Sequence, residues 1–280
     1  MASDVKGTMT AADLKDLARA VRLLEQPSVA AKLAEMAGQP VGKVLQYVPS
    51  VVTNRLRDVV SASMLKCLKA AISTLDTESA SQPSSWLPKL MTGFTGGLSG
   101  FFGLPALAVE LPITTTVMLR SIAQIARSEG ESLRSARTKL ACLEVFALGG
   151  RGMRADADVS YYATRAILAK AMNEAASFLL ERGVAEEATP VVMRLVTAIA
   201  ARFGVVVSEK VAAGAVPVLG AVGGATVNVV FMDYFQNLAR GHFIIRRLER
   251  KYGAVRVQSL YVESIGRLAS SGAAASHMLK

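Results

Sequence analysis

The sequence predicts an all-α protein: a single multi-helix domain in which two glycine-rich apolar helical segments form a tightly packed core. Apolar residues recur at intervals of three and four along most of the chain, as on one face of a helix. No stretch alternates apolar and polar residues for long enough to build a sheet. Hydrophobic residues make up 51% of the 280 residues but aromatic residues only 6%, so most apolar side chains are small enough for close helix packing.

The N-terminal region, residues 1–75, is predicted to form a group of helices. Thr10 and Asp13 resemble a capping box at a helix start, with Asp in the place of Glu. Gly38 is expected to end the second helix, because glycine is common just after a helix. The expected helices of this region cover residues 10–24, 28–37 and 41–75, the last of them broken near Pro49.

Residues 76–89 are polar and contain two prolines, and we expect them to link this region to a helical core over residues 90–265. Glycines and prolines mark the expected helix ends in the core. The predicted core helices cover residues 113–128, 131–148, 158–182, 186–203 and 229–252. Gly253 ends the last of them, and residues 266–280 are expected to be a disordered tail.

Two uncharged segments, residues 91–109 and 211–232, are rich in glycine. The first holds five glycines and the second four, and several are three or four residues apart, which places them on one helix face. Glycines in such positions let two helix backbones approach closely. Residues 211–232 have the roughly 20 residues that a membrane span needs, but Pro217 and Asn228 weaken that interpretation. The earlier segment is a poorer candidate, because Glu110 follows it at once, and then Pro112. We expect buried core helices, with reversible lipid contact and a membrane span as alternatives.

The formal net charge of +10 favours an anionic partner, although a soluble basic protein would have the same composition. Aromatic residues do not alternate with the basic ones, so no nucleic acid is expected as a partner. A basic amphipathic helix near the C-terminus can lie on an anionic membrane surface or lipid. The alternative is a surface helix whose arginines pair with acids elsewhere in the fold. The candidate lipid- or anion-binding residues are Arg240, Arg246, Arg247, Arg250 and Lys251.

Motifs for catalysis and metal binding are mostly absent from the sequence. There is no HExxH, no GxSxG and no P-loop, and two histidines cannot build a multi-histidine metal site. We therefore expect no cofactor and no metal. The rival hypothesis is a hydrolase-type enzyme, whose candidate catalytic residues are Glu110, Asp233 and His242. The other polar residues that could line such a pocket are Arg120, Glu144, Arg165 and Asn228.

Several stretches resemble the EcsC family. They are LPALAVELPITTTVMLRSIAQIARSEGESL, CLEVFALGG, YYATRAILAKA and VPVLGAVGGATVNVVFMDYFQNLARGHFIIRRLERKYG. The resemblance covers residues 40–265 and implies a bacterial, largely helical protein. It also implies a membrane-linked context, because the family is named after an operon that contains an ABC exporter, but it implies no particular reaction. The polar positions that match the family are Glu110, Arg120, Glu144, Arg165, Asn228, Asp233, His242, Arg246 and Arg247.

The sequence therefore predicts a non-enzymatic protein that contacts an anionic membrane surface or a lipid. We expect it in the cytoplasm, or peripheral to the inner face of the membrane. A third hypothesis is a protein-binding scaffold in which the basic helix docks an acidic protein partner.

Overall fold

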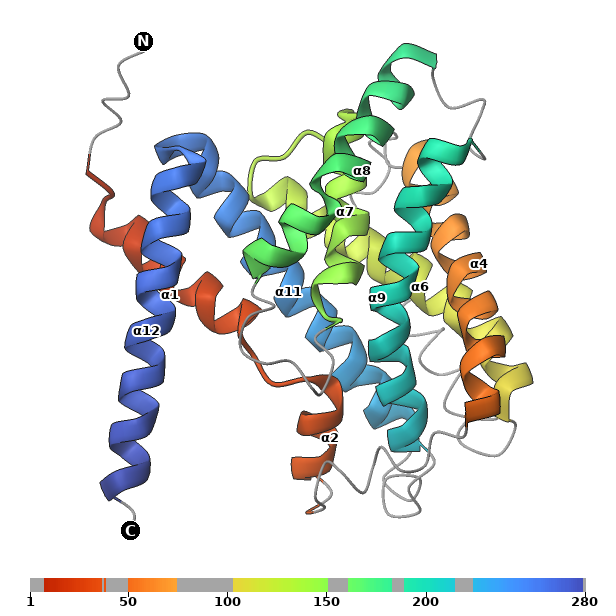
Figure 1. Cartoon of the computed structure of the whole chain (residues 1–280), viewed down its shortest axis with the longest axis horizontal. Helices are drawn as coiled ribbons and strands as arrows, with labels where there is room; N and C mark the ends of the chain where they lie inside the picture. Colours follow the sequence, from red (N-terminus) through yellow and green to blue (C-terminus); the bar gives the residue numbers. More distant parts are fainter. Residues whose placement is uncertain are drawn as a thin grey trace.

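The computed structural model describes residues 8–36, 38, 50–74, 103–150, 161–182, 189–214 and 224–278. Within these ranges the chain forms nine α-helices and no strand, which confirms the prediction of an all-α domain (Figure 1). The helices are α1 (Ala11–Leu24), α2 (Val29–Met36), α4 (Ser50–Thr74), α6 (Gly103–Ser128), α7 (Ala136–Leu148), α8 (Tyr161–Arg182), α9 (Pro190–Gly214), α11 (Gly224–Tyr252) and α12 (Ala254–Met278).

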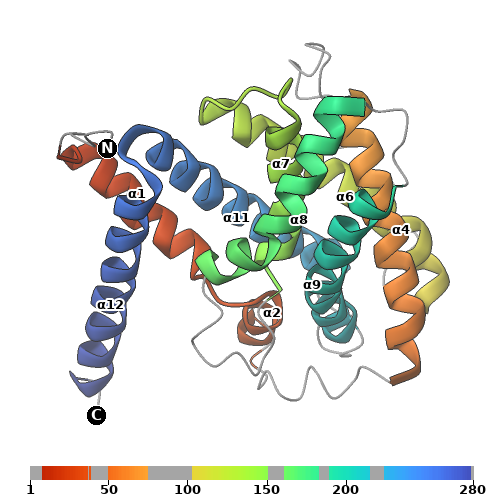
Figure 2. The same ribbon diagram turned by 45° about the horizontal axis from the view of Figure 1, so that its top comes forward.

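Helix α7 lies at the centre of the fold. Every residue from Thr138 to Leu148 is buried, as expected of a helix that packs against neighbours on all sides. These neighbours are α4, α6, α8, α9 and α11. Figures 1 and 2 show α4 and α9 side by side at one edge of the molecule and α1 with α12 at the opposite edge. A polar side chain on α7 therefore has to find its partners inside the core.

The local signals for helix ends are confirmed at several positions. The Thr10 hydroxyl accepts a hydrogen bond from the Asp13 backbone N–H at 3.2 Å and caps the start of α1. Gly38 follows α2 with a φ of 61°, and Gly253 separates α11 from α12 with a φ of 89°. These positive φ values favour glycine, which explains why the helices end there.

Three core helices are longer than predicted, and one of them, α11, begins at Gly224 instead of residue 229. Helix α6 begins at Gly103 and passes through Pro112, where the sequence predicted a start at residue 113. A proline removes the backbone hydrogen bond to the residue four positions earlier. That residue is the exposed Ala108, so water can satisfy its carbonyl group. Helix α9 likewise continues past its predicted end at residue 203 as far as Gly214.

The C-terminal region also differs from its prediction. Residues 254–278 form α12, so the tail expected from residue 266 is helical up to Met278. Val257 and Tyr261, four residues apart on one helix face, are fully buried and anchor α12 against α1 and α11. The predicted linker 76–89 and most of the first glycine-rich segment lie outside the described residues, as do residues 215–223 of the second.

Close helix approach does occur, but at glycines outside both glycine-rich segments. A Cβ atom at Gly150 would lie 2.5 Å from the Arg202 carbonyl oxygen, and one at Gly149 would lie 2.8 Å from Tyr234. At the crossing of α1 and α11, a Cβ atom at Gly241 would lie 2.6 Å from Leu24. These three glycines bring α7 against α9 and α11, and α1 against α11.

One of the described helices is long and apolar enough to cross a bilayer. It is the stretch Pro190–Ala212, with a mean hydropathy of 1.8, and 44% of its most apolar window is buried inside the protein. The core helix of a soluble protein has the same properties, so this is weak evidence for a span. The stretch precedes the segment 211–232 to which the sequence pointed.

Candidate functional site

A carboxyl, an imidazole and a phenol meet in the core where α7, α11 and α8 adjoin. The Tyr161 hydroxyl oxygen lies 2.9 Å from His242 Nδ1. On the other side of the ring, His242 Nε2 lies 3.6 Å from Glu144 Oε2. All three side chains are enclosed: the exposed fractions are 3% for Tyr161, 0% for His242 and 5% for Glu144. We call these three residues the buried triad.

Burial favours the uncharged forms of the two titratable groups at the centre of the buried triad. Desolvation lowers the pKa of His242 well below its usual value, and the nearby Arg165 and Arg246 lower it further. Desolvation also raises the pKa of the Glu144 carboxyl, although the same two arginines act in the opposite direction. A neutral carboxylic acid facing a neutral imidazole therefore fits this site better than an ion pair.

A second group of polar side chains lies beside the buried triad, between α8 and α11. Arg165 donates two hydrogen bonds to the Glu249 carboxylate, at 2.7 and 3.0 Å, and Tyr162 donates a third at 3.0 Å. The Arg165 guanidinium also lies over the rings of Tyr161 and Tyr162, at 5.3 and 5.5 Å from their centres. These contacts tie α8 to α11 and fix the Tyr161 ring beside His242.

A proton relay through the three groups would need a hydrogen bond between the Glu144 carboxyl and His242 Nε2, but at 3.6 Å this nitrogen has no hydrogen-bond partner among the described residues. A catalytic role also requires that substrate reach one of them, and all three are at least 95% buried. Among the described residues, no group of three or more His, Cys, Asp or Glu side chains could hold a metal ion. The geometry therefore supports a structural polar centre.

Replacing Glu144 by Gln tests the neutral pair. We expect the Glu144→Gln variant to lose less than about 1 kcal/mol of unfolding free energy at pH 7, because an amide replaces a neutral acid of the same shape. If Glu144 were a carboxylate paired with a charged His242, the loss would be about 3–5 kcal/mol. Urea denaturation of both proteins separates the two outcomes.

The structure does not bring the three candidate catalytic residues together. Glu110 accepts a hydrogen bond from Lys210 at 2.6 Å in a nearly buried ion pair. Asp233 is exposed, and it precedes His242 by nine residues on the same helix, roughly 13 Å along the axis. Glu110 is thus part of an ion pair between α6 and α9.

Of the four residues expected to line a pocket, two lie near His242 and two do not. Glu144 belongs to the buried triad, and Arg165 lies over the Tyr161 ring. Arg120 is exposed on α6. Asn228 is near the start of α11, where its buried Oδ1 atom has no hydrogen-bond partner. The sequence analysis did not include Tyr161 among the candidate residues.

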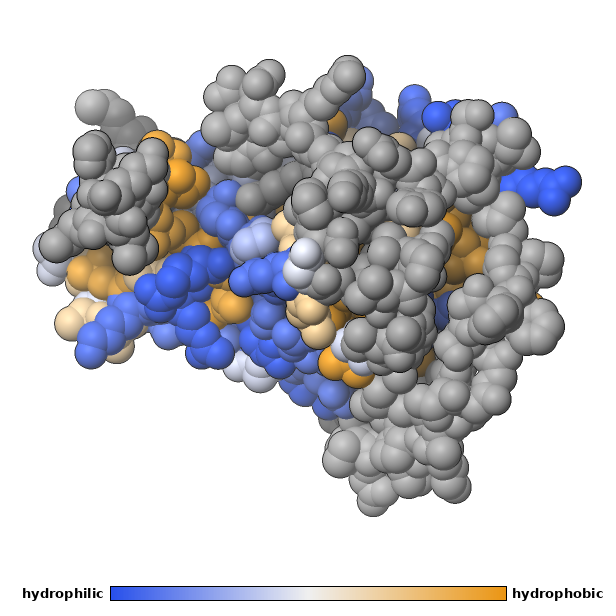
Figure 3. All heavy atoms as spheres, turned by 90° about the horizontal axis from the view of Figure 1, so that it is seen from below, coloured by the Kyte–Doolittle hydropathy of each residue, from blue (hydrophilic) through white to orange (hydrophobic). Residues whose placement is uncertain are grey.

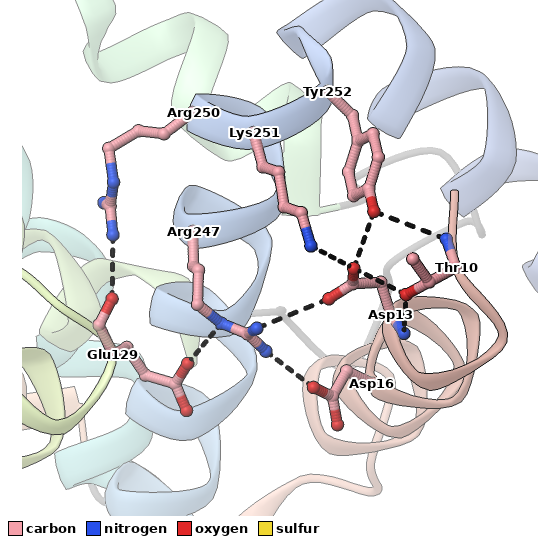
Figure 4. A network of polar contacts seen from close by, with 8 residues as sticks. All are labelled: Thr10, Asp13, Asp16, Glu129, Arg247, Arg250, Lys251 and Tyr252. Atoms are coloured by element: carbon pink, nitrogen blue, oxygen red, sulfur yellow. Dashed lines mark hydrogen bonds and ion pairs between the residues drawn. The ribbon is translucent and has the colours of Figure 1, made fainter. Parts of the chain in front are cut away.

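The five candidate lipid-binding residues of α11 form hydrogen bonds or ion pairs with other side chains of the protein. Arg247 donates to Asp16 at 2.6 Å and to Glu129 at 2.8 Å, and Lys251 donates to Asp13 at 2.7 Å (Figure 4). The contacts of the other three are with neutral or acidic groups: Arg246 and Arg250 with Glu131, and Arg240 with Gln236 and Asn237. This arrangement matches the alternative that the arginines pair with acids elsewhere in the fold.

The acid partners come from segments far away in the sequence. Asp16 is 231 residues from Arg247, and Glu131 is 115 residues from Arg246. Asp13 receives hydrogen bonds from Lys251, from the Tyr252 hydroxyl at 2.6 Å and from the Thr10 hydroxyl at 2.8 Å. The contacts of Asp13, Asp16 and Glu129 with α11 hold α1 and the end of α6 on the last core helix. We call them the α1–α11 ion network.

Comparison with known proteins agrees with the helical fold and the motifs. No curated protein and no solved structure shows significant similarity to the chain. The family model described as the EcsC protein family matches residues 12–248. This match includes every helix that contributes to the buried triad, and it covers far more than half of the 280 residues. The chain therefore belongs to the EcsC protein family.

Proposed function

We propose that this EcsC-family protein is a non-enzymatic, membrane- or lipid-associated protein that contacts the bilayer with one end of its helical body. The observation that supports this most directly is a set of large apolar side chains exposed at that end. Met36 is 56% exposed, Val109 62% and Val229 49%, and they come from three different helices, α2, α6 and α11. Figure 3 views the molecule from below Figure 1 and shows separate hydrophobic areas among hydrophilic ones, the largest of them at the left.

Contacts between helices bring these residues to the same end. Lys210, near the end of α9, pairs with Glu110 near the start of α6, and its ammonium group lies 4.9 Å from the centre of the Phe231 ring near the start of α11. The neighbouring Glu209 binds the backbone of Ala30 in α2. In Figure 1 these helix ends lie together in the lower part of the molecule.

In the sequence, uncharged parts of the two glycine-rich segments adjoin the helix ends of α6, α9 and α11. Residues 91–102 precede α6, and residues 215–223 lie between α9 and α11; neither stretch contains a charged residue. The Lys210–Glu110 pair neutralises the charges within the apolar surroundings, which lowers the cost of placing this end against lipid. An uncharged sequence that continues from helix ends with exposed valines is compatible with contact with the apolar interior of a bilayer.

Two arginines add an electrostatic attraction at the same end. Arg55 and Arg57 lie in the first two turns of α4 and are exposed. Neither forms an ion pair with a carboxylate among the described residues. A basic residue near an anionic membrane surface contributes about 1 kcal/mol to binding. This proposal moves the anionic contact from α11, whose basic residues are paired within the protein, to the start of α4.

Vesicle flotation of the intact protein tests the proposal. We expect the wild-type protein to float with vesicles of phosphatidylcholine and phosphatidylglycerol. The double variant Val109→Asp/Val229→Asp should bind at least about tenfold more weakly, because burying each valine contributes more than about 1 kcal/mol. Replacing Arg55 and Arg57 by Gln should weaken binding to the anionic vesicles and leave binding to pure phosphatidylcholine unchanged.

The matched control is Val255→Asp/Val262→Asp. These valines are 84% and 60% exposed on α12, at the far edge of the molecule, so the control carries the same charge change on exposed helix surface. It should float like the wild-type protein. Equal flotation of the two double variants, or a wild-type protein that stays at the bottom of the gradient, would rule out this contact surface.

A further inference from the structure

A carboxyl group lies buried where the short helix α2 docks on the body. Glu209 of α9 is 3% exposed, and its Oε2 atom accepts a hydrogen bond from the Ala30 backbone N–H, in the first turn of α2, at 3.1 Å. Its other oxygen, Oε1, is buried and has no hydrogen-bond partner. An unpartnered oxygen on a buried carboxyl is unfavourable, and it is far more unfavourable when the group carries a charge.

Among the described residues, no charged side chain forms an ion pair with Glu209. On α9, the adjacent Lys210 is occupied by Glu110 of α6. On α2, Lys32 donates to Gln26 at 2.6 Å and is attracted to the exposed Asp233 of α11, while Glu35 is exposed. On α4, which also packs against α9, every charged side chain that the structure describes is exposed: Arg55, Arg57, Asp58, Lys66 and Lys69.

The remainder of the α2 docking surface is small and apolar. Four side chains of this eight-residue helix are buried, with exposed fractions of 0–1%: Val29, Ala30, Leu33 and Ala34. Helix α2 contacts α9 and α11. An eight-residue helix is too short to be stable by itself in water, so its structure depends on this docking. A change in the charge of Glu209 therefore acts on the whole of α2.

We propose that α2 is a proton-controlled element, docked when Glu209 is protonated and released when it ionises. Burial raises the pKa of Glu209 to about 7, against the smaller opposing effects of the Ala30 N–H and the Ser28 hydroxyl. The proton is bound more tightly in the docked state. Docking is therefore fully stabilised at low pH and weakens as the pH rises through about 7. In the released state the carboxylate is hydrated.

Hydrogen exchange of the intact protein without lipid tests this inference independently of the proposed membrane contact. With a pKa of about 7 docked and 4.5 released, the opening equilibrium of α2 should rise about tenfold between pH 6 and pH 8. After correction for the intrinsic pH dependence of amide exchange, the protection factors of residues 29–36 should fall by that factor. Those of α11 should not change with pH.

Two variants complete the experiment. Glu209→Gln keeps the shape and the acceptor for Ala30 but cannot ionise, so its protection in α2 should be the same at both pH values. Glu35→Gln removes an exposed carboxyl from the same helix and should retain the tenfold change. A wild-type protein with equal α2 protection at pH 6 and pH 8 would overturn the inference, whatever the behaviour of either variant. If the change in α2 protection between pH 6 and pH 8 persists in Glu209→Gln, a group other than Glu209 causes it, and the inference is wrong.

Discussion

The Gly150→Ala variant is expected to lose about 3 kcal/mol of unfolding free energy, at the upper end of the range for overpacked cores. The added Cβ would lie 2.5 Å from the Arg202 carbonyl oxygen, 2.8 Å from its Cβ and 2.9 Å from its carbonyl carbon. These atoms belong to the backbone and root of a side chain inside α9, so none can move aside without moving the helix. Urea denaturation followed by circular dichroism measures the loss.

The control is Gly204→Ala, two residues from Arg202 on the same helix. A Cβ atom at Gly204 would meet nothing within 4 Å. Alanine is favoured over glycine inside a helix by about 1 kcal/mol, so this variant should gain stability. The same substitution thus has opposite signs at two neighbouring glycines. If both variants were equally stable, α7 and α9 would not be in contact as the structure has them.

This contrast also indicates what the sequence could reveal about packing. Glycines permit close helix approach at Gly149, Gly150 and Gly241. For residues 91–109 and 211–232, most of whose glycines lie outside the described residues, close packing stays a prediction. Gly149 and Gly150 were interpreted only as the end of a helix, and Gly241 was not considered. Whether a glycine is needed depends on which helix crosses it, and that is decided by contacts between distant segments of the chain.

Helix ends could be predicted where one residue determines them. Thr10, Gly38 and Gly253 act through their own backbone or side chain, so their signals are local. The helix α12 was not predicted, although Val257, Tyr261, Ile265 and Leu268 recur at helical spacing. The serine, glycine and alanine residues that follow Leu268 suggested a tail instead.

The candidate site was predictable only in part. Glu144, Arg165 and His242 were among the polar residues expected in one pocket, and the structure brings these three close together. Tyr161 is as fully buried as Glu144 and was not expected there. The basic residues of α11 suggested an anion-binding surface. Their acid partners lie on α1 and just after α6, far away in the sequence, so the sequence of α11 alone did not reveal them. Charge patterning along one helix says nothing about the charges of the helices that will pack on it.

The Asp13→Asn variant is expected to lose about 2 kcal/mol at pH 7, because it removes the carboxylate at the centre of the α1–α11 ion network. Breaking a buried ion pair costs about 3–5 kcal/mol, and the loss is reduced here since Arg247 and Lys251 are partly exposed and screened by water. Asp16→Asn is the control. Its carboxylate is 39% exposed and pairs with Arg247 alone, so the expected loss is below about 1 kcal/mol.

The pH dependence distinguishes charge from shape at Asp13. The hydrogen bond from Lys251 holds the pKa of Asp13 far below its ordinary value of 3.8, and those from Tyr252 and Thr10 lower it further. A lowered pKa stabilises the folded state above pH 3.8, and this stabilisation is lost as the pH falls below that value. The difference in unfolding free energy between the wild-type protein and Asp13→Asn should therefore be constant above about pH 5 and shrink in acid. A difference that stays the same down to pH 2 would mean that Asn fits the site poorly, and that the ionic contacts of Asp13 contribute little to holding α1.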